Sequence, residues 1–368
     1  MRDTPILIAG AGPVGSALAL ALARAGWAVG VVDAGGAQPA LPIALSLGGM
    51  RFLRGLGVSV ASACPIERVL VSEGDAPPVM FDVRLLAPEW EAWGWVVDLA
   101  GLSQAVAAQA RKAAAVWMAP ARVAAIAQTQ SGLKLRLEGA GEETLQAKLL
   151  IGADGAAGRI ARLAGWRSLL GGPYNRFALV GTLRVPAAPE ALAVERFRES
   201  GPLALLPAGE GRMHFVCVGA PKEAARLAEL SSRALAAELV AMLHPDERAR
   251  LGAPEGAEVS MVVPLMLRLA PPAVRGRVWL AGAAAHHLHP VAAQGLNLGL
   301  RDVETAADIL AAPWAREDPG APIVGEHYAQ RRAPDIAATV AVTEGLIAVF
   351  ATSLLPVRWL RRAALVAL

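Results

Sequence analysis

The chain has 368 residues, of which 55% are hydrophobic and 18% charged, and its formal net charge at pH 7 is +3. Such an apolar chain can bury a large core, which excludes intrinsic disorder, and its mild, scattered charge argues against nucleic-acid binding. The two cysteines, Cys64 and Cys217, form no CxxC or metal-ligand spacing, so a disulfide-stapled secreted fold is excluded and a reducing compartment is expected.

The apolar run from Pro5 to Ala23 is long enough to cross a bilayer, but three glycines and a proline interrupt its first half. A β-branched stretch precedes these glycines, and an Ala/Leu-rich helical pattern follows them as far as Gly26. A second strand pattern then ends at Asp33. We therefore predict a βαβ unit over residues 5–33 rather than a signal peptide or a membrane span.

The turn of this unit reads Gly10-Ala11-Gly12-Pro13-Val14-Gly15, which has the GxGxxG spacing of dinucleotide-binding loops. Gly10 is expected to make the tight turn, Gly12 to let backbone N–H groups approach a pyrophosphate, and Gly15 to let helix and strand pack. The positive end of the helix dipole faces the phosphates, and the Asp33 carboxylate stands where it can accept the ribose hydroxyls. The motif predicts a dinucleotide but leaves FAD and NAD open.

Two later strand patterns also run into glycine-rich loops. Residues 148–151 lead into a loop containing Asp154 and Gly155, and residues 278–281 lead into a loop that starts at Gly282. A helix then opens at residues 294–297, and its N-terminus is a second anion-receptive site, suited to the electron-rich edge of a reduced flavin. No second GxGxxG follows a strand, which argues against two Rossmann domains.

The C-terminal region contains a second apolar run, Ile336 to Leu355, with Glu344 at its middle. Because a charge at the bilayer midplane is unfavourable, we predict a packed helical segment that ends near Pro356. The tail at 357–365 is basic, apolar and aromatic at helical spacing. It fits an interfacial helix on anionic lipid or a solvated terminal helix, and both readings stay open.

With these motifs the chain resembles the flavoprotein aromatic hydroxylases of the p-hydroxybenzoate hydroxylase fold. More closely, it resembles the ubiquinone-biosynthesis hydroxylases, the 2-polyprenyl-6-methoxyphenol hydroxylase-like family. The resemblance covers nearly the whole chain and is carried by residues 10–15, 65–72, 94–98, 154–155, 195–197, 201–207 and 284–303, and by Tyr328, Arg332, Pro334, Asp335 and Thr343.

The resemblance implies FAD across the N-terminal unit, NAD(P)H as a transient reductant, and O2 forming a C4a-hydroperoxyflavin that hydroxylates a polyprenylated phenol. Its implied partners are other ubiquinone-biosynthesis proteins and a membrane surface contacted by the C-terminal segment, at a cytoplasmic, peripheral inner-membrane location. The implied cofactor residues are Gly10, Gly12, Pro13, Val14, Gly15, Asp33, Asp154, Gly155, Gly282, Gln294, Gly295, Leu296 and Asn297.

The remaining site residues carry more than one reading. His289 and Pro290 would lie at the flavin face, with His289 as a proton relay or a packing residue. Arg176 and Leu205 are candidate substrate contacts, although Arg176 also fits an exposed ion pair. Trp90, Trp93 and Trp95 fit a channel for the prenyl tail or plain core. The three histidines at 286, 287 and 289 fit no zinc pattern, so no metal is expected.

Five positions depart from the family pattern: Leu41, Gly158, Arg176, Ala283 and Ala293. Ala283 stands where a carboxylate or amide usually holds the ribityl chain, and losing such a hydrogen bond weakens binding by roughly 1–3 kcal/mol. These departures keep open a non-catalytic paralogue that scaffolds or binds prenylated intermediates in a quinone-biosynthesis complex.

The predicted fold class is α/β, with a Rossmann-type FAD-binding domain, a discontinuous sheet-based α+β substrate domain and a helical C-terminal tail. The expected FAD-binding domain comprises residues 1–72, 97–170 and 265–335. The expected substrate domain comprises residues 73–96 and 171–264, and the helical segment comprises residues 336–368.

Overall fold

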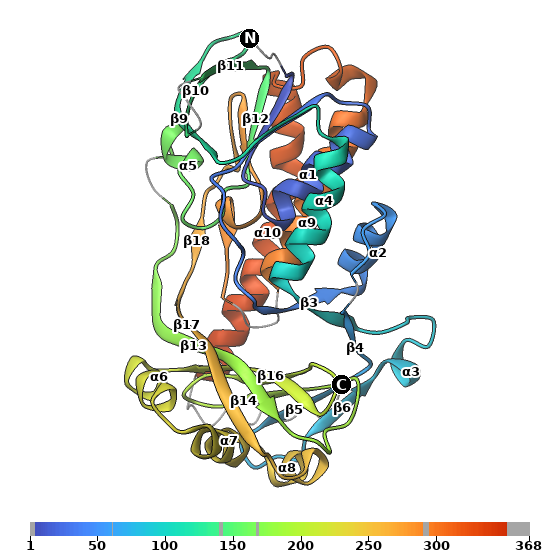
Figure 1. Cartoon of the computed structure of the whole chain (residues 1–368), viewed down its shortest axis with the longest axis vertical. Helices are drawn as coiled ribbons and strands as arrows, with labels where there is room; N and C mark the ends of the chain where they lie inside the picture. The colour runs from blue at the N-terminus through green and yellow to red at the C-terminus, as the bar shows by residue number, and fades with distance from the viewer. Residues whose placement is uncertain (1–3, 61, 140–142, 167–168, 290–293, 352–368) are drawn as a thin grey trace.

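The computed structural model describes residues 4–60, 62–139, 143–166, 169–289 and 294–351. Two sheet-based parts lie end to end along the long axis of the molecule (Figure 1). The predicted α/β class, with a Rossmann-type part and a second sheet-based part, is confirmed.

The first part is built on a six-stranded sheet. In spatial order its strands are β19 (Val274–Arg275), β20 (Val278–Leu280), β12 (Leu149–Gly152), β1 (Ile6–Ala9), β2 (Val29–Val32) and β8 (Val116–Met118). All neighbouring strands are parallel except β19 and β20. β1 lies at the centre, with Ile6 paired to both Leu149 and Val29. This strand is apolar at every position because both of its faces are buried.

Helices cover one face of this sheet and a small antiparallel sheet covers the other (Figure 1). The helices are α1 (Pro13–Arg24), α4 (Leu99–Ala113), α9 (Gln294–Ala311) and α10 (Pro322–Ala351), and the small sheet contains β9 (Ala121–Gln128), β10 (Leu133–Gly139) and β11 (Glu143–Ala147). Side chains alternate along β1, so Ile6 and Ile8 pack on the helices while Leu7 and Ala9 pack against the small sheet.

The second part is a seven-stranded sheet. In order, its strands are β17 (Gly256–Met266), β13 (Pro173–Arg184), β16 (Arg212–Gly219), β15 (Leu203–Pro207), β14 (Leu192–Phe197), β5 (Arg68–Glu73) and β6 (Val79–Asp82). One face packs on three short helices, α6 (Pro221–Ala228), α7 (Ser232–Ala241) and α8 (Pro245–Leu251). The opposite face looks towards the first part and borders the cavity described below.

Smaller elements complete the described chain. They are the antiparallel sheet of β3 (Pro42–Ser46), β7 (Gly94–Asp98) and β4 (Cys64–Ile66), the pair β18 (Arg268–Leu269) and β21 (His286–His287), the helices α2 (Leu47–Gly55), α3 (Val83–Leu86) and α5 (Ile160–Leu163), and the 3-10 turns η1 (Gly282–Ala284) and η3 (Pro313–Ala315).

Strand pairing moves one predicted boundary. β5 runs parallel to β14, with Arg68 opposite Leu192 and Glu73 opposite Phe197. Residues 68–73 therefore lie in the seven-stranded sheet, not with residues 1–72 as predicted. A parallel pairing between segments so distant in sequence leaves no local signal by which its strand can be assigned to one sheet rather than another.

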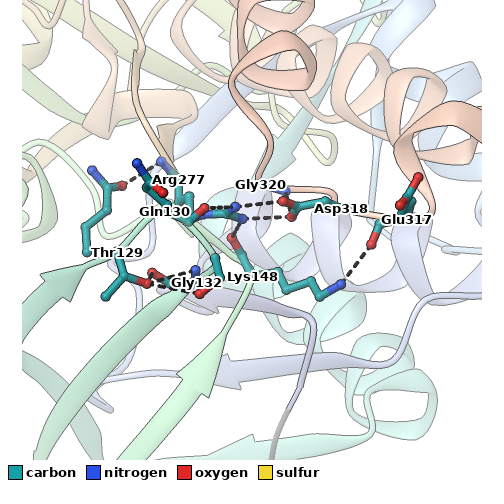
Figure 2. Close-up of polar contacts among 10 residues, drawn as sticks. Thr129, Gln130, Gly132, Lys148, Arg277, Glu317, Asp318 and Gly320 are labelled. Atoms are coloured by element: carbon teal, nitrogen blue, oxygen red, sulfur yellow. Dashed lines mark hydrogen bonds and ion pairs between the residues drawn. The ribbon is translucent and has the colours of Figure 1, made fainter.

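A buried arginine joins the far edge of the first part to the loop before α10 (Figure 2). Arg277 is 5% exposed, and its two Nη atoms each lie 2.7 Å from a carboxylate oxygen of Asp318. The guanidinium also donates to the main-chain oxygens of Gln130 and Lys148. Arg277 holds the pKa of the Asp318 carboxyl below its ordinary value through this hydrogen bond. The fork geometry suits arginine and fixes this corner of the sheet.

The predicted helical segment at 336–368 begins earlier than expected, because α10 is continuous from Pro322 to Ala351 with Pro334 inside it. Residues 352–368, which include the predicted interfacial tail, lie outside the described residues. Within the described chain, no helix combines the length and apolar character needed to span a membrane.

Candidate active site

One large cavity of about 1060 Å³ lies between the two parts of the molecule. Its wall on one side is formed by the GxGxxG turn, the start of α9 and the loops after β2 and β12. On the other side the wall is the open face of the seven-stranded sheet. We call these two regions the nucleotide half and the sheet half of the cavity.

Each of the three motif glycines is required for a different structural reason. Gly10 has φ of +104°, and a Cβ on it would lie 2.4 Å from the main-chain oxygen of Ala153. A Cβ on Gly15 would lie 1.9 Å from the main-chain oxygen of Gly10. At Gly12 the only atom within 4 Å of such a Cβ is Nε2 of Gln38, at 3.8 Å. The lack of a side chain at Gly12 thus leaves open space inside the cavity, as its predicted role requires.

Asp33 ends β2 and fixes the loop around the predicted ribose position. Its Oδ2 accepts a hydrogen bond of 2.7 Å from the Ala11 main-chain N–H, and its Oδ1 accepts one of 2.8 Å from Gly35. A carboxylate has room for further donors, and Asp33 lines the cavity. The structure therefore gives it a loop-shaping contact in addition to the predicted ribose contact.

Asp154 follows β12 and lies against the nucleotide half. Its Oδ2 accepts from the main-chain N–H groups of Arg159, at 2.5 Å, and Ile160, at 3.0 Å. Oδ1 is buried and has no hydrogen-bond partner among the described residues. Burial raises the pKa of this carboxyl above its ordinary value, against the lowering effect of the two backbone donors. An orphaned acceptor at the cavity wall fits a site that is completed by a ligand.

Gly158 was expected to weaken the flavin site, and the structure gives it a different role. A Cβ at this position would lie 2.3 Å from the carboxylate of Asp154. Glycine is therefore what allows Asp154 to pack in this place. This departure from the family pattern supports Asp154 and does not count towards a degenerate site.

A buried polar cluster forms hydrogen bonds with the loop that follows β20. Asp302 Oδ2 accepts from the Gly282 main-chain N–H, at 2.8 Å, and from His286 Nε2, at 2.6 Å. Asp302 Oδ1 accepts from Arg332 Nε at 2.7 Å. The side chains of His286, Asp302 and Arg332 are each no more than 5% exposed. Gly282 was among the predicted site residues, but Asp302 was not. Asp302 connects Gly282 to α9, on which it lies, and to Arg332 on α10.

The start of α9 contains predicted site residues that line the cavity, and one of them also bonds to a neighbouring strand. Gln294, Gly295, Leu296 and Asn297 all line the cavity. Among the described residues, apart from the chain neighbours and the backbone of α9 itself, no atom lies within 4 Å of the place of a Cβ on Gly295, and nothing beyond the chain neighbours lies that close at Gly155. Asn297 accepts from the Ser46 main-chain N–H at 2.9 Å and donates to the Ala44 oxygen at 3.0 Å. Its amide therefore ties α9 to β3, a contact that the prediction of a cofactor ligand did not include.

Two other departures also lie at the cavity. Leu41 and Ala283 both line it, so neither supplies the polar contact expected from the family. Arg159, Arg122 and Gln38 carry polar groups at the cavity and were not among the predicted site residues. Arg159 pairs with Glu138 at 2.5 Å. None of the three stands in a recognisable motif, so only the folded chain reveals them. Ala293 lies outside the described residues.

Of the two residues predicted to lie at the flavin face, the structure describes one. His289 lines the cavity, is 4% exposed and packs edge-on against Tyr174, with ring centroids 5.1 Å apart. The Tyr174 hydroxyl donates to Glu344 on α10, and burial and this carboxylate raise the pKa of Tyr174 above its ordinary value. Pro290 lies outside the described residues.

Burial lowers the pKa of His289 to about 4. The unfolded chain, with an imidazole pKa near 6.5, therefore binds a proton more readily than the folded chain. We expect the free energy of unfolding to fall as the pH drops from about 6.5 to 4, by up to about 3 kcal/mol from this residue. Urea unfolding across this range should show a smaller fall in His289→Asn than in the wild type. Exposed His327→Asn is the control, and equal pH dependence of all three proteins would contradict the assignment.

The structure places two predicted substrate contacts outside the lining of the cavity. Leu205 is fully buried on the helix-covered face of β15, while its neighbours Ala204 and Leu206 line the cavity, because side chains alternate along a strand. Arg176 is not among the cavity-lining residues; its Nη1 lies 3.3 Å from the Asn175 oxygen. Trp93 lines the cavity, whereas Trp95 is 6% exposed in the core and Trp90 is 40% exposed.

The sheet half is mostly apolar. Its lining from the seven-stranded sheet includes Val69, Ala178, Val180, Ala193, Glu195, Ala204, Leu206, Val216, Val218, Val263 and Leu265. Glu195 is the one acidic residue in this set. In the sequence it served only as part of a segment that carries the family resemblance, and no role was predicted for it. The described residues contain no group of three or more His, Cys, Asp or Glu side chains suited to a metal ion.

Comparisons with known proteins agree with this geometry. Residues 3–343 match a family described as an FAD binding domain. Ubiquinone hydroxylase UbiL of Rhodospirillum rubrum is 32% identical over 371 residues, which cover 97% of this chain and 84% of that protein. The 3-demethoxyubiquinol 3-hydroxylase of Escherichia coli is 30% identical over 387 residues, covering 100% and 95%.

Solved structures share the fold. PqsL, a probable FAD-dependent monooxygenase from Pseudomonas aeruginosa, superposes with a TM-score of 0.80 at 22% identity and covers 100% of both chains. The p-nitrophenol 4-monooxygenase PnpA from Pseudomonas putida gives a TM-score of 0.80 at 20% identity, covering 99% of this chain and 94% of that one. The predicted family and the predicted FAD cofactor are thus confirmed. The chain belongs to the FAD-dependent ubiquinone hydroxylases and is a flavoprotein monooxygenase.

Proposed function

We propose that this enzyme hydroxylates the ring of a polyprenylated phenol in ubiquinone biosynthesis, with NAD(P)H as reductant and O2 as oxidant. The observation that carries the proposal is the single cavity in which a dinucleotide-binding turn faces a wide apolar sheet surface. The names of the relatives from Rhodospirillum rubrum and Escherichia coli support a ubiquinone precursor as the substrate.

The residues of the nucleotide half and those of the sheet half have different roles. The backbone at Gly12 and the N-terminus of α1 bind the pyrophosphate, and Asp33 and Asp154 fix the surrounding loops. Bound FAD supplies the oxidising chemistry, which no side chain here can provide. The apolar sheet half excludes water and packs on the greasy substrate, so the ring is oriented in a dry pocket.

The reaction can be tested directly with the full chain reconstituted with FAD. We expect a prenylated phenol to stimulate NAD(P)H oxidation and to gain one oxygen atom. With 18O2 the product should carry one 18O by mass spectrometry, and with 18O-water and ordinary O2 it should carry none. Failure to take up FAD, or NAD(P)H oxidation that no prenylated phenol stimulates, would contradict the proposal.

The proposed partners follow from the substrate. A polyprenylated phenol resides in a membrane, so we propose that the enzyme works at the surface of the inner membrane beside other ubiquinone-biosynthesis proteins. The basic, aromatic segment at 357–365 is the proposed contact with anionic lipid. Co-sedimentation of the full chain with anionic vesicles, and its loss when Arg358, Arg361 and Arg362 are replaced by glutamine, would support this location.

A further inference from the structure

Three acidic side chains line the cavity among the described residues: Asp33, Asp154 and Glu195. The first two are engaged with backbone N–H groups of the nucleotide half. Glu195 instead projects from β14 on the sheet half, where the other lining side chains of the seven-stranded sheet are apolar. A carboxyl group in such a place needs an explanation, because desolvating it without a partner is unfavourable.

The surroundings of Glu195 supply no partner. Val71 on β5 and Ala204 on β15 stand directly opposite it on the paired strands. No described residue donates a hydrogen bond to its carboxylate or forms an ion pair with it. The side chain is half-buried and lines the cavity, so a ligand there can reach it.

The other titratable groups of these strands have positions or partners of their own. His214 on β16 stands opposite Leu206, with its Nδ1 3.5 Å from the Thr182 hydroxyl. Arg196, the residue after Glu195, points to the helix-covered face, where its Nη1 bonds to Ser72 at 3.1 Å. Arg68 and Glu73 stand at the two ends of β5, opposite Leu192 and Phe197. Burial alone raises the pKa of the Glu195 carboxyl to about 7. The group can therefore exchange a proton near neutral pH, as a general base should.

We propose that Glu195 binds the hydroxyl group of the phenol substrate and acts as its general base. The carboxylate accepts the hydroxyl hydrogen bond and then the proton. The phenolic O–H bond breaks, an O–H bond forms on Oε of Glu195, and the electron pair stays on the phenolate oxygen, where it enriches the ring positions that are oxidised. This inference rests on the proposed function and gives the sheet half a polar contact for the substrate.

The test compares Glu195→Gln and Glu195→Leu with the wild-type FAD-loaded enzyme. Both variants should fold, because each replaces a desolvated carboxyl by a neutral group. The matched control is Glu258→Gln, an exposed residue on β17 of the same sheet. The probes are 2-geranylphenol and its methyl ether, which lacks the hydroxyl hydrogen, and their binding is measured by calorimetry.

We expect wild type and Glu258→Gln to bind the phenol about tenfold more tightly than the ether, and Glu195→Leu to lose this preference. In wild type, kcat/KM should rise with pH through about 7, since only the ionised carboxylate accepts the proton. In Glu195→Gln this rise should disappear and kcat/KM at pH 8 should fall about 100-fold.

The outcomes separate the two proposals. If the wild type binds the phenol but the variants keep both its preference and its pH profile, Glu195 is not the base while the proposed function stands. If the wild type binds neither probe and oxidises no prenylated phenol, the proposed function fails and the role of Glu195 falls with it. If the wild type shows the preference and the pH dependence and only the Glu195 variants lose them, both proposals are supported.

Discussion

A chain carrying Gly12→Val is expected to fold normally and to purify without flavin. The backbone at Gly12 has φ of −64° and ψ of −178°, a conformation open to any residue, and an added Cβ would lie 3.8 Å from Gln38 Nε2, an ordinary contact distance. The branched carbons of valine would instead occupy the space in which the pyrophosphate must approach the backbone. We expect FAD affinity to fall at least about 100-fold, which corresponds to about 2.7 kcal/mol.

Stability and cofactor binding should therefore separate in this variant. Valine is a poor N-cap residue, so thermal unfolding of the apoprotein should report a loss of no more than about 1 kcal/mol. Gly55→Val, at an exposed helix end outside the cavity, is the matched control and should keep its FAD. A yellow Gly12→Val protein with wild-type affinity in a fluorescence titration would contradict the assignment. Gly15→Val, by contrast, should disrupt the fold itself.

Replacing Asp302 with alanine is expected to destabilise the first part of the molecule strongly. Asp302 accepts from Arg332, His286 and the Gly282 main chain, and it is about 1% exposed. Its removal leaves a buried guanidinium with only Asp335 as its carboxylate partner. Breaking a buried ion pair in this way typically costs about 3–5 kcal/mol. Urea unfolding of the apoprotein measures the loss.

The same two helices offer a matched control. Asp308 on α9 pairs with Arg331 on α10 at 3.2 Å, but both side chains are more than half exposed. Asp308→Ala should therefore lose no more than about 1 kcal/mol. A double change, Asp302→Ala with Arg332→Met, should recover part of the stability because the unpaired charge is gone. Equal losses for Asp302→Ala and Asp308→Ala would show that burial of the cluster does not matter.

Local patterns predicted the parts of the site that depend on neighbouring residues. The strand, glycine turn, helix and terminal Asp33 all follow one another in sequence, and the structure has them as β1, α1 and β2. The patterns also predicted a second anion-receptive helix start at residues 294–297, and these residues line the same cavity as the glycine turn.

The errors arose where pairing between distant strands decides the outcome. Whether Leu205 or Leu206 faces the cavity depends on which side of the sheet the helices cover, and no local pattern contains that information. The polar roles of Asn297 and Asp302 depend on β3 and α10, which are remote in sequence. Gly158 was judged from a missing side chain, but its role is to leave room for another.

The order of strands in the six-stranded sheet has a consequence for synthesis on the ribosome. The strand β1 is made first and can pair early with β2, but its other neighbour β12 emerges only at Leu149, and β20 beyond it only at Val278. The seven-stranded sheet likewise needs β17 to pair with β13. The edge of β1 that pairs with β12 therefore stays open until Leu149 has been made, and the cavity lining is complete only after residues 294–297 have been made. Nascent chains of this enzyme should depend on chaperones until then, and FAD can bind only near the end of translation.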